Sequence, residues 1–188
     1  SLVVESLRDV IDEADVRTRL IDRVAYASDA SHYYNVPAAV IVASDINEVS
    51  HAFKVAVEHD LSVTLRSGGT SLSGQASGAG LLVDVRRGFR NMSVQDSGRI
   101  IRVQPGLTVS QVNARLALYG RKLGPDPASE SAATIGGVIN NNSSGMACGT
   151  EFNTYQTLRG LTLVLPSGTV IDTSAQDADA RLRALEPK

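Results

Sequence analysis

The run Arg-Ser-Gly-Gly-Thr-Ser-Leu-Ser-Gly at residues 66–74 has the composition of a phosphate-binding loop. Seven of its nine residues are Gly, Ser or Thr, so the backbone can approach a ligand closely and several N–H groups can point the same way. The apolar stretch Leu61–Leu65 leads into the run and is typical of a strand. A small-residue loop after a strand predicts a site where backbone amides surround a diphosphate. A flexible surface turn is the alternative interpretation.

The two common phosphate-binding signatures do not match this loop. A P-loop requires Lys followed by Ser or Thr after its second glycine, and this chain has Gln75 and Ala76 after Gly74. The dinucleotide-binding fingerprint requires three glycines at spacings of two and three residues before a helix, and no three glycines of the segment have that spacing. The sequence therefore predicts a diphosphate site outside both classes.

A second cluster of small residues occupies positions 132–145, with the sequence Ala-Ala-Thr-Ile-Gly-Gly-Val-Ile-Asn-Asn-Asn-Ser-Ser-Gly. Gly136 and Gly137 permit close backbone approach, and Thr134 and the asparagines offer short polar side chains. A long polar loop of this kind is more often functional than merely connecting, so we expect a second part of the binding site here. The alternative is a solvated linker with an Asn-rich turn.

Composition limits the classes of function. The 188 residues suit one large domain or two small lobes, and a net charge of −2 without a basic cluster does not indicate a nucleic-acid partner. The single cysteine, Cys148, excludes an internal disulfide and a Cys-rich metal or iron–sulfur site within the chain. We expect Cys148 to be a structural thiol, and no metal site is predicted. This cysteine usage favours a reducing, cytoplasmic setting.

Two blocks of elements position these clusters. The first begins with short helices within residues 7–24. It continues with a buried strand at 38–43, a helix at 45–59 that Asp45 caps and a strand at 62–65, which together make a β-α-β unit. The small-residue loop follows the second strand of this unit, where ligands gather in such folds.

The second block contains strands joined by hairpins. Its elements are strands at 81–85 and 99–104, a helix that Thr108 and Gln111 cap and that ends at Gly120, a hairpin within 158–172, and a final helix at 175–188. These elements indicate an α+β fold. We expect a small β-α-β lobe over about residues 1–78 and a larger lobe over about residues 79–188, with a mainly antiparallel sheet and flanking helices.

Together these segments resemble one family. Residues 24–173 are similar to the PCMH-type FAD-binding domain of the vanillyl-alcohol oxidase/p-cresol methylhydroxylase superfamily, and within it to the branch of FAD-linked D-lactate dehydrogenases and glycolate oxidases. Residues 140–150 further resemble the long bacterial members that carry an iron–sulfur half. The matching motifs are Pro37-Ala-Ala-Val-Ile-Val, Leu65-Arg-Ser-Gly-Gly-Thr-Ser-Leu-Ser-Gly-Gln, Val103-Gln-Pro-Gly, Leu123-Gly-Pro-Asp-Pro, Ala133-Thr-Ile-Gly-Gly and the hairpin that includes Gly160 and Gly168.

The resemblance implies FAD as the cofactor and assigns residues to it. Members with covalent flavin often have His where this chain has Thr70, so the resemblance implies FAD held without a covalent link. Arg66 either helps to neutralise the diphosphate or forms a surface salt bridge. The implied contacts are Arg66, Ser67, Gly68, Gly69, Thr70, Ser71, Leu72, Gly74, Gln75 and Ala76 for the diphosphate, Pro127, Ala133, Thr134, Gly136, Gly137, Asn140, Asn141, Gly145, Gly149 and Thr150 for the flavin and its ribityl chain, and Ile171 for the adenine.

The resemblance also implies a reaction. Members of this branch are FAD-dependent oxidoreductases that act on CH–OH groups, and we expect oxidation of a 2-hydroxy acid such as D-lactate or glycolate. No residue of this chain is predicted to be catalytic, because a cap domain that we expect to be absent from this sequence supplies the catalytic groups in the family. His32 is expected to be a polar residue near the flavin entrance. A non-redox module that binds a nucleotide or phosphosugar is the alternative function, and a scaffold domain is a third.

The expected partners follow from the same resemblance. They are a small 2-hydroxy acid, held through the cap domain, and an iron–sulfur domain, a quinone or another electron-transfer acceptor. The longest apolar runs are far shorter than a membrane span, so membrane association is expected only through further parts of the parent protein.

Overall fold

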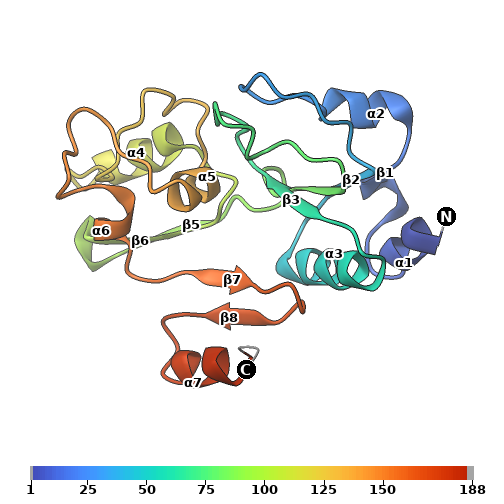
Figure 1. Cartoon of the computed structure of the whole chain (residues 1–188). Coiled ribbons are helices and arrows are strands. Elements are labelled where there is room, and N and C mark those ends of the chain that lie inside the picture. The colour runs from blue at the N-terminus through green and yellow to red at the C-terminus, as the bar shows by residue number, and fades with distance from the viewer. Residues whose placement is uncertain (1, 186–188) are drawn as a thin grey trace.

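The computed structural model describes residues 2–185, and a four-stranded sheet forms the first part of the molecule (Figure 1). The elements of this part are α1 (Leu2–Arg8), the 3-10 turn η1 (Glu13–Asp15), β1 (Val16–Arg17), α2 (Leu20–Ala25), β2 (Ala39–Val42), α3 (Ile46–Glu58), β3 (Val63–Arg66) and β4 (Leu81–Asp84). The strand order is β1-β2-β4-β3. Strands β2 and β3 flank β4 and run parallel to it, whereas β1 is antiparallel to β2. The carboxyl ends of the three parallel strands therefore meet at one edge.

Apolar residues explain why the central strands are buried. All four residues of β2 and all four of β4 are buried, as expected for parallel strands that are covered on both faces. Asp45 caps α3 by accepting hydrogen bonds from the N–H groups of Asn47 and Glu48, so the predicted β-α-β unit is confirmed. Helix α3 packs on the sheet through a buried stripe of Val49, Ala52, Val55 and Ala56.

Strand β4 corrects the predicted division of the chain. The sequence analysis placed residues 81–85 in a second lobe that starts at about residue 79, whereas Leu81–Asp84 pairs in parallel with both β2 and β3. An apolar run predicts a buried strand but carries no information about the neighbours of that strand. The first part of the molecule therefore extends beyond residue 78 to the end of β4.

The second part consists of a hairpin and short helices around a separate apolar core (Figure 1). Its elements are β5 (Met92–Gln95), the 3-10 turn η2 (Asp96–Gly98), β6 (Ile100–Val103), α4 (Val109–Ala117), α5 (Ile135–Asn140) and α6 (Thr154–Thr157). Strands β5 and β6 pair antiparallel, and Thr108 and Gln111 begin α4 with the predicted capping box. The buried core residues are Leu107, Val109, Val112, Leu116, Ala133, Ile135 and Val138.

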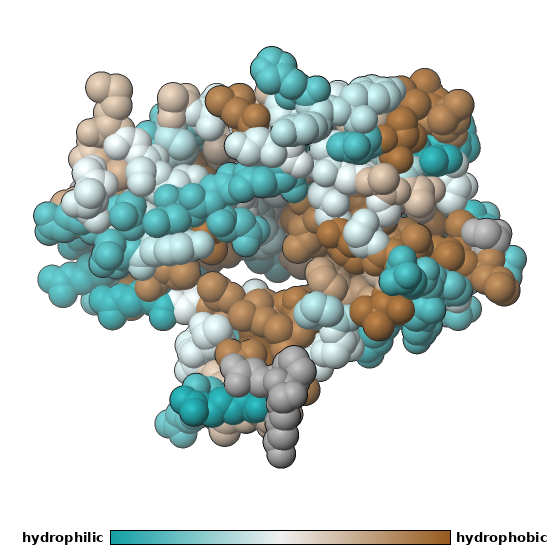
Figure 2. Space-filling model, in the orientation of Figure 1, coloured by the Kyte–Doolittle hydropathy of each residue, from teal (hydrophilic) through white to brown (hydrophobic). Residues whose placement is uncertain are grey.

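A further hairpin, β7 (Thr162–Val164) and β8 (Val170–Asp172), leads to α7 (Ala178–Leu185) and confirms the predicted hairpin. It lies below both parts in Figure 1. Figure 2 shows a hollow between this hairpin and the parts above it, with apolar surface on the hairpin side. Residues 186–188 of the predicted final helix lie outside the described residues. From α1 to α7, no described helix is long and apolar enough to cross a membrane.

The α+β class is confirmed, and three details differ from the prediction. Strand β5 was not expected, because its residues do not form the apolar run of a buried strand. In the structure they are largely exposed, and only Val94 is half-buried. Residues 132–145 are not a loop throughout, because Ile135 and Val138 are buried on one side of α5. The strands of the expected larger sheet form, among the described residues, two separate antiparallel pairs, β5–β6 and β7–β8.

Candidate cofactor-binding site

The loop after β3, residues 66–76, presents a row of backbone donors. The N–H groups of Gly69, Thr70, Ser71 and Leu72 make no hydrogen bond within the described part of the chain. Gly69 has φ of +67°, a left-handed conformation that glycine adopts without strain. Successive free N–H groups around a left-handed residue form a concavity that binds anions. The loop also lies at the carboxyl end of β3, the edge where ligands bind to parallel sheets.

Hydrogen bonds join this loop to the second small-residue segment. The N–H group of Gly68 donates to Oγ1 of Thr134 at 3.0 Å, and the Thr134 hydroxyl donates in turn to the Ser67 hydroxyl. Ser67 completes the chain by donating to the carbonyl oxygen of Pro105 at 3.0 Å. A Cβ atom on Gly68 would lie 2.6 Å from the carbonyl oxygen of Ala132. The two segments that the sequence singled out are therefore in direct contact.

Arg66 directs its charge toward the chain before β2. Its guanidinium donates to the carbonyl oxygens of Tyr26 at 3.1 Å and Ser28 at 2.7 Å. The guanidinium carbon also lies 5.6 Å from the centre of the Tyr26 ring, a distance at which cations are attracted to aromatic faces. Within the described part of the chain, the contacts of Arg66 are thus with carbonyl oxygens and a ring, not with the carboxylate that a salt bridge would require.

Helix α5 packs closely on one side and is open on the other. The N–H group of Gly136 donates to the carbonyl oxygen of Pro105 at 3.1 Å, and a Cβ atom there would lie 2.8 Å from the Pro105 side chain. At Gly137, by contrast, no other described residue comes within 4 Å of where a Cβ atom would be. Asn140 and Asn141 at the end of the helix are exposed. The open side of α5 can therefore approach a ligand.

A carboxylate supports the segment after α5. Asp126 accepts hydrogen bonds from the N–H groups of Ala147 at 3.0 Å and Cys148 at 3.1 Å, and the hydrogen bond from Ala147 is the main reason why the pKa of Asp126 is below its usual value. Gly145 packs against Asp126, whereas Gly149 is exposed. Asp126 was not among the predicted site residues, although it lies within the matching motif Leu123-Gly-Pro-Asp-Pro. Of the other predicted residues, Pro127 adjoins Asp126 and is half-buried, and Thr150 lies just after the supported segment and is exposed.

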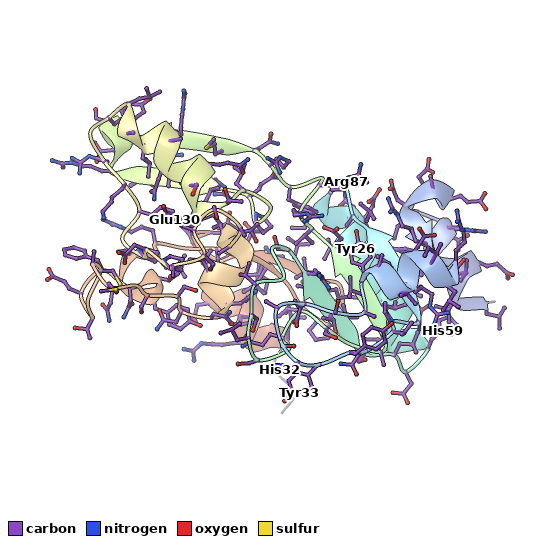
Figure 3. All side chains as sticks on the ribbon, turned by 90° about the horizontal axis from the view of Figure 1, so that it is seen from above. Tyr26, His32, Tyr33, His59, Arg87 and Glu130 are labelled. Carbon is purple, nitrogen blue, oxygen red and sulfur yellow. The ribbon has the colours of Figure 1, made fainter. Side chains whose placement is uncertain are left out.

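The other predicted positions are more dispersed. Ile171 lies in β8 and is 1% exposed, so only its backbone is available to a ligand. His32 is exposed and lies beside Tyr33, away from His59 (Figure 3); its place near a flavin entrance stays a prediction. The thiol of Cys148 is buried and points at the carbonyl oxygens of Gly145 and Gly149, as expected for a structural thiol.

Comparisons with known proteins identify the relatives. Residues 37–174 match the family described as FAD binding domain. The chain is 31% identical over 169 residues to D-2-hydroxyglutarate dehydrogenase of Haemophilus influenzae, which covers 87% of this chain and 16% of that protein. It is 30% identical over 158 residues to glycolate oxidase subunit GlcD of Bacillus subtilis, and this alignment covers 82% of this chain and 33% of that protein. The chain thus spans a third or less of the length of these relatives.

The solved structures agree with the sequence match. The structure of p-cresol methylhydroxylase with substrate bound has a TM-score of 0.75 to this chain at 16% identity, over 94% of this chain and 37% of that one. At this identity the likeness establishes a shared fold, which includes the sheet and the hairpins described above. The family match begins just before β2 and ends just after β8, so it contains both small-residue segments. The chain therefore belongs to the FAD binding domain family, as its motifs predict.

Proposed function

We propose that this chain carries the FAD of a flavin-dependent oxidoreductase that oxidises the CH–OH group of a 2-hydroxy acid. The names of the relatives support the substrate class, because D-2-hydroxyglutarate and glycolate are both 2-hydroxy acids; D-lactate belongs to the same class. Since the chain corresponds to a minor part of each relative, the reaction belongs to the whole protein. The share of this chain is to hold and orient the cofactor.

The four N–H groups from Gly69 to Leu72, which have no partner within residues 2–185, carry this proposal. The diphosphate of FAD is an anion with oxygen acceptors on both phosphates. Successive backbone N–H groups that lack a partner within the protein can bind such anions without a charged side chain. The loop therefore fits the diphosphate, and we assign its residues from Ser67 to Ala76 to that part of FAD.

We assign the remaining parts of FAD to the two other segments. The open side of α5, at Gly137, favours contact with a flat ring, since among the described residues nothing occupies the space beside it. The flavin and ribityl chain are therefore assigned to α5 and to the segment up to Thr150, and the adenine to the backbone at Ile171. Thr70 has no imidazole nitrogen with which to form a covalent link to the flavin, so we propose that FAD is held non-covalently.

The reaction needs groups that we place in the rest of the parent protein. Bound FAD supplies the acceptor for the hydride that leaves the hydroxyl-bearing carbon. Removal of that hydride also requires a base near the hydroxyl and cationic groups that hold the carboxylate. We propose that a cap domain supplies both, and that an iron–sulfur domain, a quinone or another acceptor receives the electrons.

Ligand-dependent stability tests the cofactor assignment. Purified chain is titrated with FAD and, separately, with FMN, which lacks the adenine half. A ligand that binds only the folded state raises Tm, and we expect a clear rise with FAD and a much smaller one with FMN. Equal stabilisation by the two would contradict contact with the adenine half. Stabilisation by ADP together with none by FAD would favour a non-redox nucleotide-binding module.

The division of labour has its own test. FAD-loaded chain is mixed anaerobically with D-2-hydroxyglutarate, D-lactate or glycolate, and the flavin absorption band is followed. We expect no bleaching by any of the three acids and full bleaching by dithionite, which requires only access to the flavin. Bleaching by a hydroxy acid within seconds would show that the catalytic groups are already in these residues, and His32 would be the first candidate.

A further inference from the structure

Residues 26–35, which we call the strap, contact the loop 66–76 at its start and at its end. At the start of the loop, Arg66 donates to two carbonyl oxygens of the strap, those of Tyr26 and Ser28. Three residues further on, the N–H group of Ala30 donates to the carbonyl oxygen of Gly69 at 3.0 Å. Just beyond the end, Asn35 donates to Ser77 at 3.1 Å. The strap precedes residues 37–174, the segment that matches the family.

Asp29 joins the strap to the end of the loop through its side chain. One of its carboxylate oxygens accepts the N–H group of Ala76 at 3.3 Å, and the other accepts the N–H group of Ser31 at 2.8 Å. Partial burial raises the pKa of Asp29, but the hydrogen bonds from Ser31 and Ala76 and the nearby charge of Arg66 together lower it by more, so the net shift is downward. A carboxylate thus ties the strap to the end of the loop and partly balances Arg66.

The strap is itself anchored to the sheet at its start and packs on the loop near its other end. The hydroxyl of Tyr26 donates to Asp84 at 2.7 Å, and Asp84 is 1% exposed in the central strand β4. At the other end the ring of Tyr33 touches Gly74 so closely that a side chain there would collide with it. Figure 3 shows Tyr26 over the sheet and Tyr33 at the far tip of the strap. The loop is therefore held between the sheet and an anchored segment.

We propose that the strap pre-organises the loop for the diphosphate, with Asp29 and Arg66 as positioning residues. This inference rests on the proposed function, in which the loop binds the diphosphate of FAD. Ordering a free backbone costs about 1–2 kcal/mol per residue, and a loop that is already ordered before binding avoids that cost. Arg66 then acts by holding the loop through strap carbonyls, and the backbone donors at residues 69–72 meet the anion.

Asp29→Ala tests the proposal, and Asp12→Ala is its matched control, because Asp12 accepts the N–H group of Ala14 in the same local pattern but away from the loop. We expect Asp29→Ala to weaken FAD binding at least tenfold, mainly through slower association. Without FAD, the amide hydrogen of Ala30 should exchange faster in this variant. Asp12→Ala should bind FAD as the unchanged chain does. Equal FAD affinity in Asp29→Ala and the unchanged chain overturns the proposal.

Arg66→Lys gives a second, independent readout. Both strap bonds come from one guanidinium nitrogen, Nη1. Lys keeps the positive charge but lacks the planar guanidinium that packs on the Tyr26 ring and fixes the position of that nitrogen. A positioning role predicts that Arg66→Lys and Arg66→Gln lose FAD affinity equally, at least tenfold each. Rescue of affinity by Lys overturns the positioning role in favour of a counter-ion, and this test stands if Asp29→Ala does not fold. If the unchanged chain binds no FAD at all, the proposed function fails first and the inference falls with it.

Discussion

Two segments of similar composition adopt different structures in this molecule. Residues 66–76 form a loop with four successive N–H groups that have no partner among the described residues. Residues 132–145 contain the helix α5, and the N–H groups at its start, those of Ile135 and Gly136, donate to the carbonyl oxygens of Leu107 and Pro105. The first segment thus offers donors to a ligand, and the second uses its donors to build the fold.

The difference comes from a few apolar residues. In the second segment, Ile135 and Val138 are three positions apart and both are buried, which pulls one side of a helix into the core. In the first segment, the only large apolar residue after Arg66 is Leu72, and it is 78% exposed. Small residues therefore permit either structure, and burial decides which one forms.

Replacing Gly69 by Val should have the largest effect on the loop. A β-branched residue at φ of +67° is strained, and its Cβ atom would lie 3.1 Å from the Arg66 guanidinium. We expect FAD affinity to fall well over tenfold, which corresponds to more than about 1.4 kcal/mol, while the fold persists. Titration of FAD against the variant, followed by flavin fluorescence, measures this.

Gly120→Val is the matched control for that change. Gly120 has φ of +65°, and apart from its chain neighbours no residue within 2–185 lies within 4 Å of its Cβ position. It lies in the turn after α4, outside both small-residue segments. The control should lose stability from the same backbone strain and keep its FAD affinity. If both variants lost FAD affinity equally, strain alone would explain the effect and the loop would not be the site.

Thr134→Val removes the hydrogen bonds that join the two segments. Thr134 is 2% exposed, and Val keeps its shape but leaves the N–H group of Gly68 without an acceptor. We expect a loss of about 1 kcal/mol in the free energy of unfolding, measured by urea denaturation. Thr162→Val is the control, because Thr162 is exposed and accepts only from Arg102 at the surface. An equally small loss of unfolding free energy in both variants would mean that the hydrogen bonds of Thr134 between the two segments add nothing to stability beyond packing.

How far the sequence predicts this arrangement depends on the range of the interactions. Local signals were sufficient for the helix cap at Asp45 and for the turn between β7 and β8, because those contacts lie within a few residues. The pairing of β4 and the contact between Tyr26 and Asp84 connect distant positions, and no periodicity encodes them. Asp29 was missed, although Asp-Ala-Ser is a local turn signal in which an Asp side chain bonds the backbone two residues later.

Replacing Gly137 by Ala distinguishes two effects of this glycine in α5: its cost to helix stability and the space that it leaves for a ligand. Because the space beside Gly137 is free of other described residues, an added methyl group meets nothing in the chain. Ala also favours a helix over Gly by about 0.5–1 kcal/mol, so the FAD-free variant should be slightly more stable in urea. FAD affinity should fall several-fold, because the methyl group occupies space that we assign to the flavin. A gain in stability without a loss of affinity would remove Gly137 from the site.

Asp172→Asn should have the smallest effect, because it breaks a link at the surface. Asp172 adjoins the proposed adenine contact Ile171 and accepts a hydrogen bond from Arg102 at 2.9 Å. The pKa of Asp172 lies well below its usual value, mainly because of the hydrogen bond from the Ser174 hydroxyl and next because of the one from Arg102. The folded-state pKa lies below the unfolded one, so the stabilisation is complete above about pH 4 and is lost as pH falls through the folded value.

The Tm of Asp172→Asn should therefore be slightly below that of the unchanged chain at pH 7, and the difference should shrink below about pH 4. The loss of stability should be smaller than the one that Thr134→Val causes. High salt should reduce it as well, because exposed charges are screened. FAD affinity should stay within about twofold, since backbone pairing of β7 with β8 holds Ile171 in place without this link. A large loss of FAD affinity would instead place the charge of Asp172 or Arg102 at the adenine end of the site, and would make the hairpin a third determinant beside the two small-residue segments.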